Sequence, residues 1–77
     1  MLLTTRQRKK LRWLKRFDDE KNSYSVGHYH FISDGTETKE DVETMIWFAD
    51  TWLDLNGERI VDNYEELTKR LEKLNDK

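Results

Sequence analysis

The chain contains no cysteine, no proline and only three glycines among its 77 residues. Without cysteine it has neither a disulfide framework nor thiolate chemistry, which excludes a disulfide-stapled secreted miniprotein and predicts a cytoplasmic location. Without proline nothing interrupts a helix, and so few glycines signal few tight turns. The chain also lacks an apolar run near the ~20 residues of a membrane span, and we expect no membrane partner.

Aromatic side chains are plentiful, with three each of tryptophan, tyrosine and phenylalanine, although charged residues make up 39% of the chain. Disordered chains are poor in aromatic residues, so this composition predicts a folded core. We expect one small domain over residues 1–77, with a thin margin of stability. Some domains of this size are stable only with a partner or as a dimer.

Charge is distributed unevenly along the chain. Residues 1–16 contain seven basic side chains and no acidic one, whereas all sixteen acids lie in the remainder. Such asymmetry suggests a charged partner for one end of the chain. The alternative is internal, with a basic helix lying against an acidic remainder.

The strongest helical pattern lies in the middle of the chain. Apolar residues recur there at helical spacing and form one stripe, which consists of Val42, Met45, Ile46, Ala49, Trp52 and Leu53. We predict a helix over about 38–56, with Thr38 as its N-cap and Gly57 as its left-handed C-cap. Alternatively, this glycine and the asparagine before it form a hairpin turn between 51–55 and 58–62.

Two further helices are predicted, one near each end of the chain. Apolar spacing at Leu11, Leu14 and Phe17 predicts a helix over about 3–18. Apolar residues at 3-4-3 spacing from Tyr64 to Leu74 predict a helix over about 63–75, with Asn63 at its N-cap.

The segment of about residues 22–34 breaks the helical pattern. Its side chains alternate with a period of two over about 23–33 and are rich in aromatic and β-branched residues, which predicts an extended strand. This strand packs over the helices, pairs with another copy of the chain, or pairs with residues 59–61. We therefore predict a mostly α fold, a small three-helix domain with one extended segment between the first two helices. The alternative is an α+β fold with a small sheet or hairpin.

Trp47 is the residue that most suggests a binding site. It lies outside the apolar stripe of the central helix, on a face that carries acidic side chains, namely Glu40, Glu43, Asp50 and Asp54. An exposed tryptophan is a typical anchor of a protein interface. An acidic row can occupy a basic partner, by mimicking a phosphate backbone for example. The alternatives are that the same chain covers Trp47 and that the acids form a solvated helix face.

The basic N-terminal segment offers a second site. Five cations there could contact nucleic-acid phosphates, and these are Arg8, Lys9, Arg12, Lys15 and Arg16. Membrane-surface binding is not expected, because the apolar face of this helix is narrow.

A third possibility is a homodimer. The C-terminal helix carries a seam of two heptads, which is formed by Ile60, Tyr64, Leu67, Leu71 and Leu74. The seam either packs on the central helix or joins two copies of the chain.

We expect neither a metal site nor catalysis. His28 and His30 would share one face of a strand, but Asp34 is the one further ligand nearby, and two imidazoles do not complete a site. No nucleophile elbow and no glycine-rich phosphate loop is present. The chain therefore implies no cofactor.

The sequence thus predicts a non-enzymatic regulator or inhibitor that presents the Trp47 face to a basic, possibly nucleic-acid-handling protein. The alternatives are a small nucleic-acid-binding protein and a homodimeric structural or adaptor module. In size and composition the chain is similar to the cysteine-free, charge-rich accessory proteins of phages and mobile elements, many of which bind and block a host protein.

Overall fold

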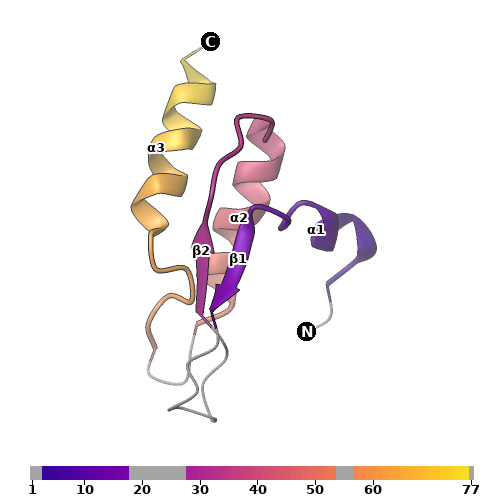
Figure 1. Cartoon of the computed structure of the whole chain (residues 1–77), viewed down its shortest axis with the longest axis vertical. Coiled ribbons are helices and arrows are strands. Elements are labelled where there is room, and N and C mark those ends of the chain that lie inside the picture. The colour runs from indigo at the N-terminus through magenta and orange to yellow at the C-terminus, as the bar shows by residue number, and fades with distance from the viewer. Residues whose placement is uncertain (1–2, 18–27, 54–56, 77) are drawn as a thin grey trace.

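The computed structural model describes residues 3–17, 28–53 and 57–76. In chain order its elements are α1 (Thr5–Lys9), β1 (Leu14–Phe17), β2 (His28–Phe31), α2 (Lys39–Thr51) and α3 (Tyr64–Asn75). Figure 1 shows α2 behind the two strands, with α3 on the side of β2 and α1 on the side of β1. The predicted fold class is confirmed, since the described part of the chain forms three helices and a two-stranded antiparallel sheet.

The predicted helix over 3–18 is wrong in its extent. Thr4 and Gln7 form a capping box that starts α1, but the helix ends at Lys9 and buries none of its residues. Residues 14–17 form β1 instead, where Leu14 lies opposite Phe31 and both side chains are buried. Pairing with β2 satisfies the backbone of this segment while burying the Leu14 side chain, and such tertiary contacts override weak helix propensity.

β2 lies between β1 and the segment that leads into α3. The Tyr29 N–H donates to the Ile60 carbonyl at 2.7 Å, and the Asp62 N–H donates to the Tyr29 carbonyl at 2.9 Å. Tyr29 and Val61 thereby form a parallel bridge. Of the three partners considered for the extended segment, the structure thus shows residues 59–61 on one edge, while β1 occupies the other.

The Asn63 side chain extends this pairing by one more step. Its Oδ1 accepts from the Phe31 N–H at 2.7 Å, and its Nδ2 donates to the Phe31 carbonyl at 2.8 Å. The amide thus takes the place of a strand backbone. Asn63 precedes α3 as predicted, but its side chain makes no capping hydrogen bond, because it is committed to β2.

The core lies between the sheet, α2 and α3. Its buried members come from every element except α1, and they are Trp13, Leu14, Phe31, Val42, Met45, Phe48, Ala49, Ile60, Val61 and Leu67. The Tyr29 ring meets the Phe48 ring edge-on at 5.4 Å between centroids. The predicted stripe of α2 is confirmed at Val42, Met45 and Ala49, which are completely buried.

The C-terminal end of α2 differs from the prediction. The helix begins after the expected N-cap, Thr38, which forms a capping box with Asp41, but it ends at Thr51 rather than near residue 56. Leu53 is 46% exposed and forms an antiparallel bridge with Arg59. Gly57 has a positive φ of 81° but does not cap the helix. The bridge agrees with the alternative prediction of a hairpin between 51–55 and 58–62, and the chain then continues so that Ile60 and Val61 lie beside β2. Residues 54–56 lie outside the described residues.

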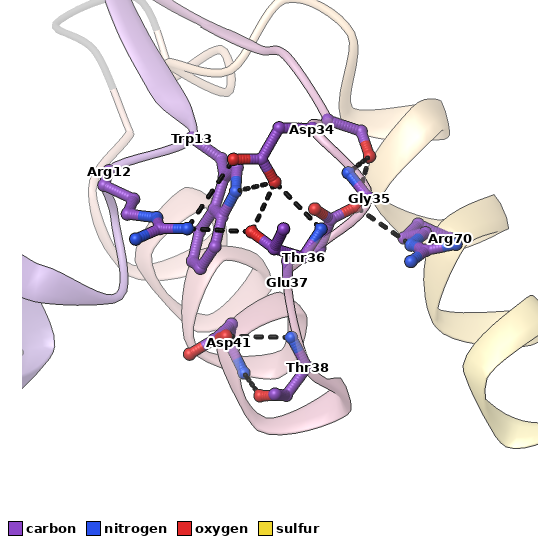
Figure 2. A network of polar contacts seen from close by, with 10 residues as sticks. Arg12, Trp13, Asp34, Gly35, Thr36, Glu37, Thr38, Asp41 and Arg70 are labelled. Carbon is purple, nitrogen blue, oxygen red and sulfur yellow. Dashed lines mark hydrogen bonds and ion pairs between the residues drawn. The ribbon is translucent and has the colours of Figure 1, made fainter.

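A polar network fixes the turn between β2 and α2 (Figure 2). Asp34 Oδ1 accepts hydrogen bonds from the Thr36 hydroxyl at 2.6 Å, the Thr36 N–H at 2.9 Å and the Trp13 indole N–H at 2.7 Å. The Arg12 guanidinium lies over the Trp13 ring, 4.3 Å from its centroid. The hydrogen bonds from Thr36 and Trp13, assisted by the charge of Arg12, lower the pKa of Asp34 below its ordinary value.

An ion pair with a buried carboxylate ties the same turn to α3. The Glu37 side chain has no exposed surface, accepts a hydrogen bond from the Ser33 hydroxyl, and lies 2.9 Å from Arg70 Nε. Figure 2 shows Arg70 reaching this carboxylate from α3. A carboxylate buried this deeply requires such a partner, so the pair fixes how α3 lies against the turn.

Substituting Asn63 tests the pairing of its side chain with β2. We expect Asn63→Ala to lower the free energy of unfolding by about 1–3 kcal/mol, because the part-buried Phe31 N–H and carbonyl lose their partners. Asn75→Ala, at the exposed far end of α3, is the matched control and should change the free energy of unfolding little. Urea denaturation of both variants makes the comparison, and equal stabilities would contradict the assignment.

The Asp34 network predicts a pH dependence of stability. Because the folded-state pKa of Asp34 lies below the ordinary value of 3.8, its carboxylate stabilises the fold above that pH. This contribution is lost as the pH falls towards the folded-state pKa. We expect Asp34→Asn to lower the urea midpoint at pH 6, and we expect the difference from the wild type to shrink progressively as the pH falls below 3.8. Asp76→Asn, at an exposed acid, should follow the wild type throughout; a constant offset for Asp34→Asn would contradict the prediction.

Candidate protein-binding groove

α1 and its C-cap residue, Lys10, lie against the first turn of α2 through ion pairs. Arg6 Nη2 is 3.0 Å from Glu40 Oε1, and Lys10 Nζ is 3.1 Å from Asp41 Oδ1 and 3.5 Å from Glu40 Oε1. Part of the basic N-terminal segment therefore pairs with acids of the same chain, which is the internal explanation of the charge asymmetry.

The two contacts differ in their exposure to solvent. The side chains of Lys10 and Asp41 are only 16% and 13% exposed, whereas those of Arg6 and Glu40 are 78% and 62% exposed. Burial alone would raise the pKa of Asp41, but hydrogen bonds from Thr38 and Lys10 outweigh it and lower that pKa. The shielded Lys10–Asp41 pair, the inner pair, therefore contributes more to holding α1 in place. The exposed Arg6–Glu40 pair, the outer pair, is weakened by solvent screening.

A shallow groove of about 270 Å³ lies between the two helices. Trp47 lines it, half-buried, with part of its side chain packed against the core. The other lining residues are Gln7, Glu40, Glu43 and Thr44. The structure thus brings together three of the predicted interface residues, Trp47, Glu40 and Glu43, and adds two that the sequence did not indicate.

The remaining acids of the predicted row do not line the groove. Asp50 Oδ1 accepts a hydrogen bond from Arg59 Nε at 3.2 Å, and Asp54 lies outside the described residues. Glu43 is exposed and forms no ion pair within residues 3–17, 28–53 and 57–76. Among the described residues, an incoming cation could therefore pair with Glu43 without displacing another cation, whereas Glu40 is already paired with Arg6 and Lys10.

The predicted nucleic-acid site does not form one helix face. Because residues 14–17 are a strand, its five members are divided among α1, the following turn and β1. Arg12 is engaged with Trp13 and with Asp34, from which it lies 3.6 Å. Arg8, Lys9 and Lys15 are exposed, as is Arg16 on β1.

The predicted dimer seam faces the core of its own chain. Ile60 and Leu67 are completely buried, and the other three members, Tyr64, Leu71 and Leu74, are partly buried against the same cluster. The seam therefore packs within the chain, which was the first of its two alternatives. A dimer contact through Ile60 or Leu67 would require the core to open.

The histidines of β2 are not gathered around a metal position. His28 Nδ1 lies 2.8 Å from Asp62 Oδ1, and Asp34 is occupied by Trp13 and Thr36. Within the part of the chain that the structure describes, histidines and acids form no group of three suited to a metal ion.

A larger hollow of about 750 Å³ lies beside the start of α3. Its lining carries both signs of charge, and several of the side chains there already have partners. His28 pairs with Asp62, and Arg59 lies 4.2 Å from the Tyr64 ring centroid while pairing with Asp50. The groove between α1 and α2 is smaller, but it places Glu43, which has no ion pair among the described residues, beside a tryptophan.

Comparison with known proteins finds no family model that matches the chain, and neither a curated protein nor a solved structure that is similar to it. Among the described residues, the helices are too short or too polar to cross a membrane.

The unequal exposure of the two α1 contacts predicts unequal costs of breaking them. Lys10→Ala should lower the free energy of unfolding by about 1–3 kcal/mol, because it leaves the part-buried Asp41 without its cation. Arg6→Ala should cost at most about 1 kcal/mol, since its pair with Glu40 is exposed. Chemical denaturation gives both values, and a larger loss for Arg6→Ala would refute this ranking.

Proposed function

We propose that this protein is a non-enzymatic binding protein that takes a basic segment of another protein into the groove between α1 and α2, and thereby regulates or inhibits that partner. The observation that carries the proposal is the position of the half-buried Trp47 beside the carboxylates of Glu40 and Glu43 in one groove.

Each part of the groove has a physical role in this function. The tryptophan supplies a large, rigid apolar surface, and such side chains carry much of the binding energy of protein interfaces. The two carboxylates at the rim attract a positively charged segment and favour it over an acidic one. A shallow groove suits a protruding side chain of a protein better than a small molecule, which needs deeper enclosure.

The partner is expected to be basic at its contact surface. Proteins that handle nucleic acids have such surfaces, because they neutralise phosphates with lysine and arginine. Acids at regular spacing along α2 can occupy the same side chains. A partner of this class would be blocked from its nucleic acid while the groove is filled.

Direct nucleic-acid binding by this chain has less support. Among its N-terminal cations, Arg6, Lys10 and Arg12 already pair with acids of the same chain. The remaining ones are spread over different elements rather than along one stripe. The observations therefore favour the groove.

A selection from a random peptide-display library tests the proposal, because it needs no candidate partner. We expect the wild-type chain to enrich peptides that combine lysine or arginine with a bulky apolar residue. Binding of the enriched peptides should fall at least about tenfold with Glu43→Lys, since a carboxylate that can pair is replaced by a like charge.

Glu72→Lys is the matched control, because it makes the same change at an exposed position of α3, away from the groove. Peptides that bind both variants equally, or enrichment without basic residues, would overturn the proposal. Circular dichroism of both variants establishes that they are folded.

A further inference from the structure

The contacts of α1 describe the partner in more detail. Arg6 and Lys10 are four residues apart, and both reach Glu40. Residues four apart on a helix lie on the same face, one turn from each other. Gln7 lies between them and lines the groove. The acidic start of α2 therefore already binds one basic helical turn, supplied by its own chain.

α1 is only partly fixed in this position. The helix has five residues, none of them buried. It is attached at one end by the shielded pair of Lys10 with Asp41, whereas Arg6 contacts Glu40 at a position open to solvent. An incoming cation can replace Arg6 at Glu40 without disturbing the inner pair or the core.

Glu43 provides the second half of the same surface. It follows Glu40 by three residues on α2, so the two carboxylates lie on one helix face, and both line the groove with Trp47. Two cations that are one helical turn apart would meet these two acids. An apolar residue on the same face of that segment would contact the indole.

We propose that α1 occupies part of the partner's binding site, and that the groove binds a basic helical segment of another protein. This segment has two cations one turn apart and an apolar residue on the same face, and it displaces Arg6 from Glu40. The inference rests on the proposed function. The N-terminal segment then weakens binding of any ligand that lacks this pair of charges and raises selectivity for those that have it.

A synthetic helical peptide with arginines at positions i and i+4 and a leucine on the same face is the probe, measured by titration calorimetry against the full chain. We expect Arg6→Gln to bind this peptide about two- to fivefold more tightly than the wild type, since an exposed ion pair no longer competes. Arg8→Gln removes the same charge from an exposed position of the same helix, so it corrects for the change in net charge.

The outcomes separate this inference from the proposed function. Equal gains for Arg6→Gln and Arg8→Gln would overturn displacement of Arg6, while binding that still requires Glu43 would leave the proposed function standing. Equal affinity for a peptide with its arginines at i and i+2 would overturn the helical spacing. If neither peptide binds the wild type or the Arg6 variant, both the inference and the proposed function fail.

Discussion

The hydrogen bonding of β2 on both edges is the constraint on which the rest of the fold depends. A strand of four residues cannot remain extended alone in water, because its backbone groups need partners. β1 supplies them on one edge, and Ile60, Asp62 and the Asn63 side chain supply them on the other. Both the N-terminal and the C-terminal parts of the chain are therefore brought to the same strand.

This constraint sets the lengths of the helices. α1 must end early so that residues 14–17 can extend beside β2, and α2 must end at Thr51 so that the chain can return to Tyr29 through Ile60. The early end of α1 leaves Leu14 to β1, where it is buried opposite Phe31. The groove beside Trp47 is a consequence, because an α1 of five residues covers only the first part of α2.

The sequence predicted the parts of the fold that depend on local signals. The N-cap at Thr38 and the stripe of Val42, Met45 and Ala49 located α2, and the 3-4 spacing of leucines located α3. The segment around Leu14 was misassigned because its few apolar residues fit helical spacing as well as strand pairing. Only the distant Phe31 decides between the two, and no local pattern reveals it.

The site was predictable to a similar degree. Trp47 and its neighbouring acids stood out from the apolar stripe, but whether Trp47 and Glu40 were free depended on contacts with residues more than thirty positions away. The pairing of Glu40 with Arg6 and the approach of Gln7 are of this kind. The charge asymmetry indicated ion pairing within the chain as one of two alternatives. It could not identify which of the basic side chains would form these pairs.

The most direct test of the groove as a docking site is a nuclear magnetic resonance titration of the ¹⁵N-labelled full chain with the basic helical peptide. The three tryptophans give three indole N–H signals, and a Trp47→Phe variant assigns the one that matters. The Trp13 signal is an internal reference, since its indole is bonded to Asp34. We predict that the Trp47 signal shifts progressively while that of Trp13 stays in place. A peptide that binds and leaves the Trp47 signal unmoved would contradict the account.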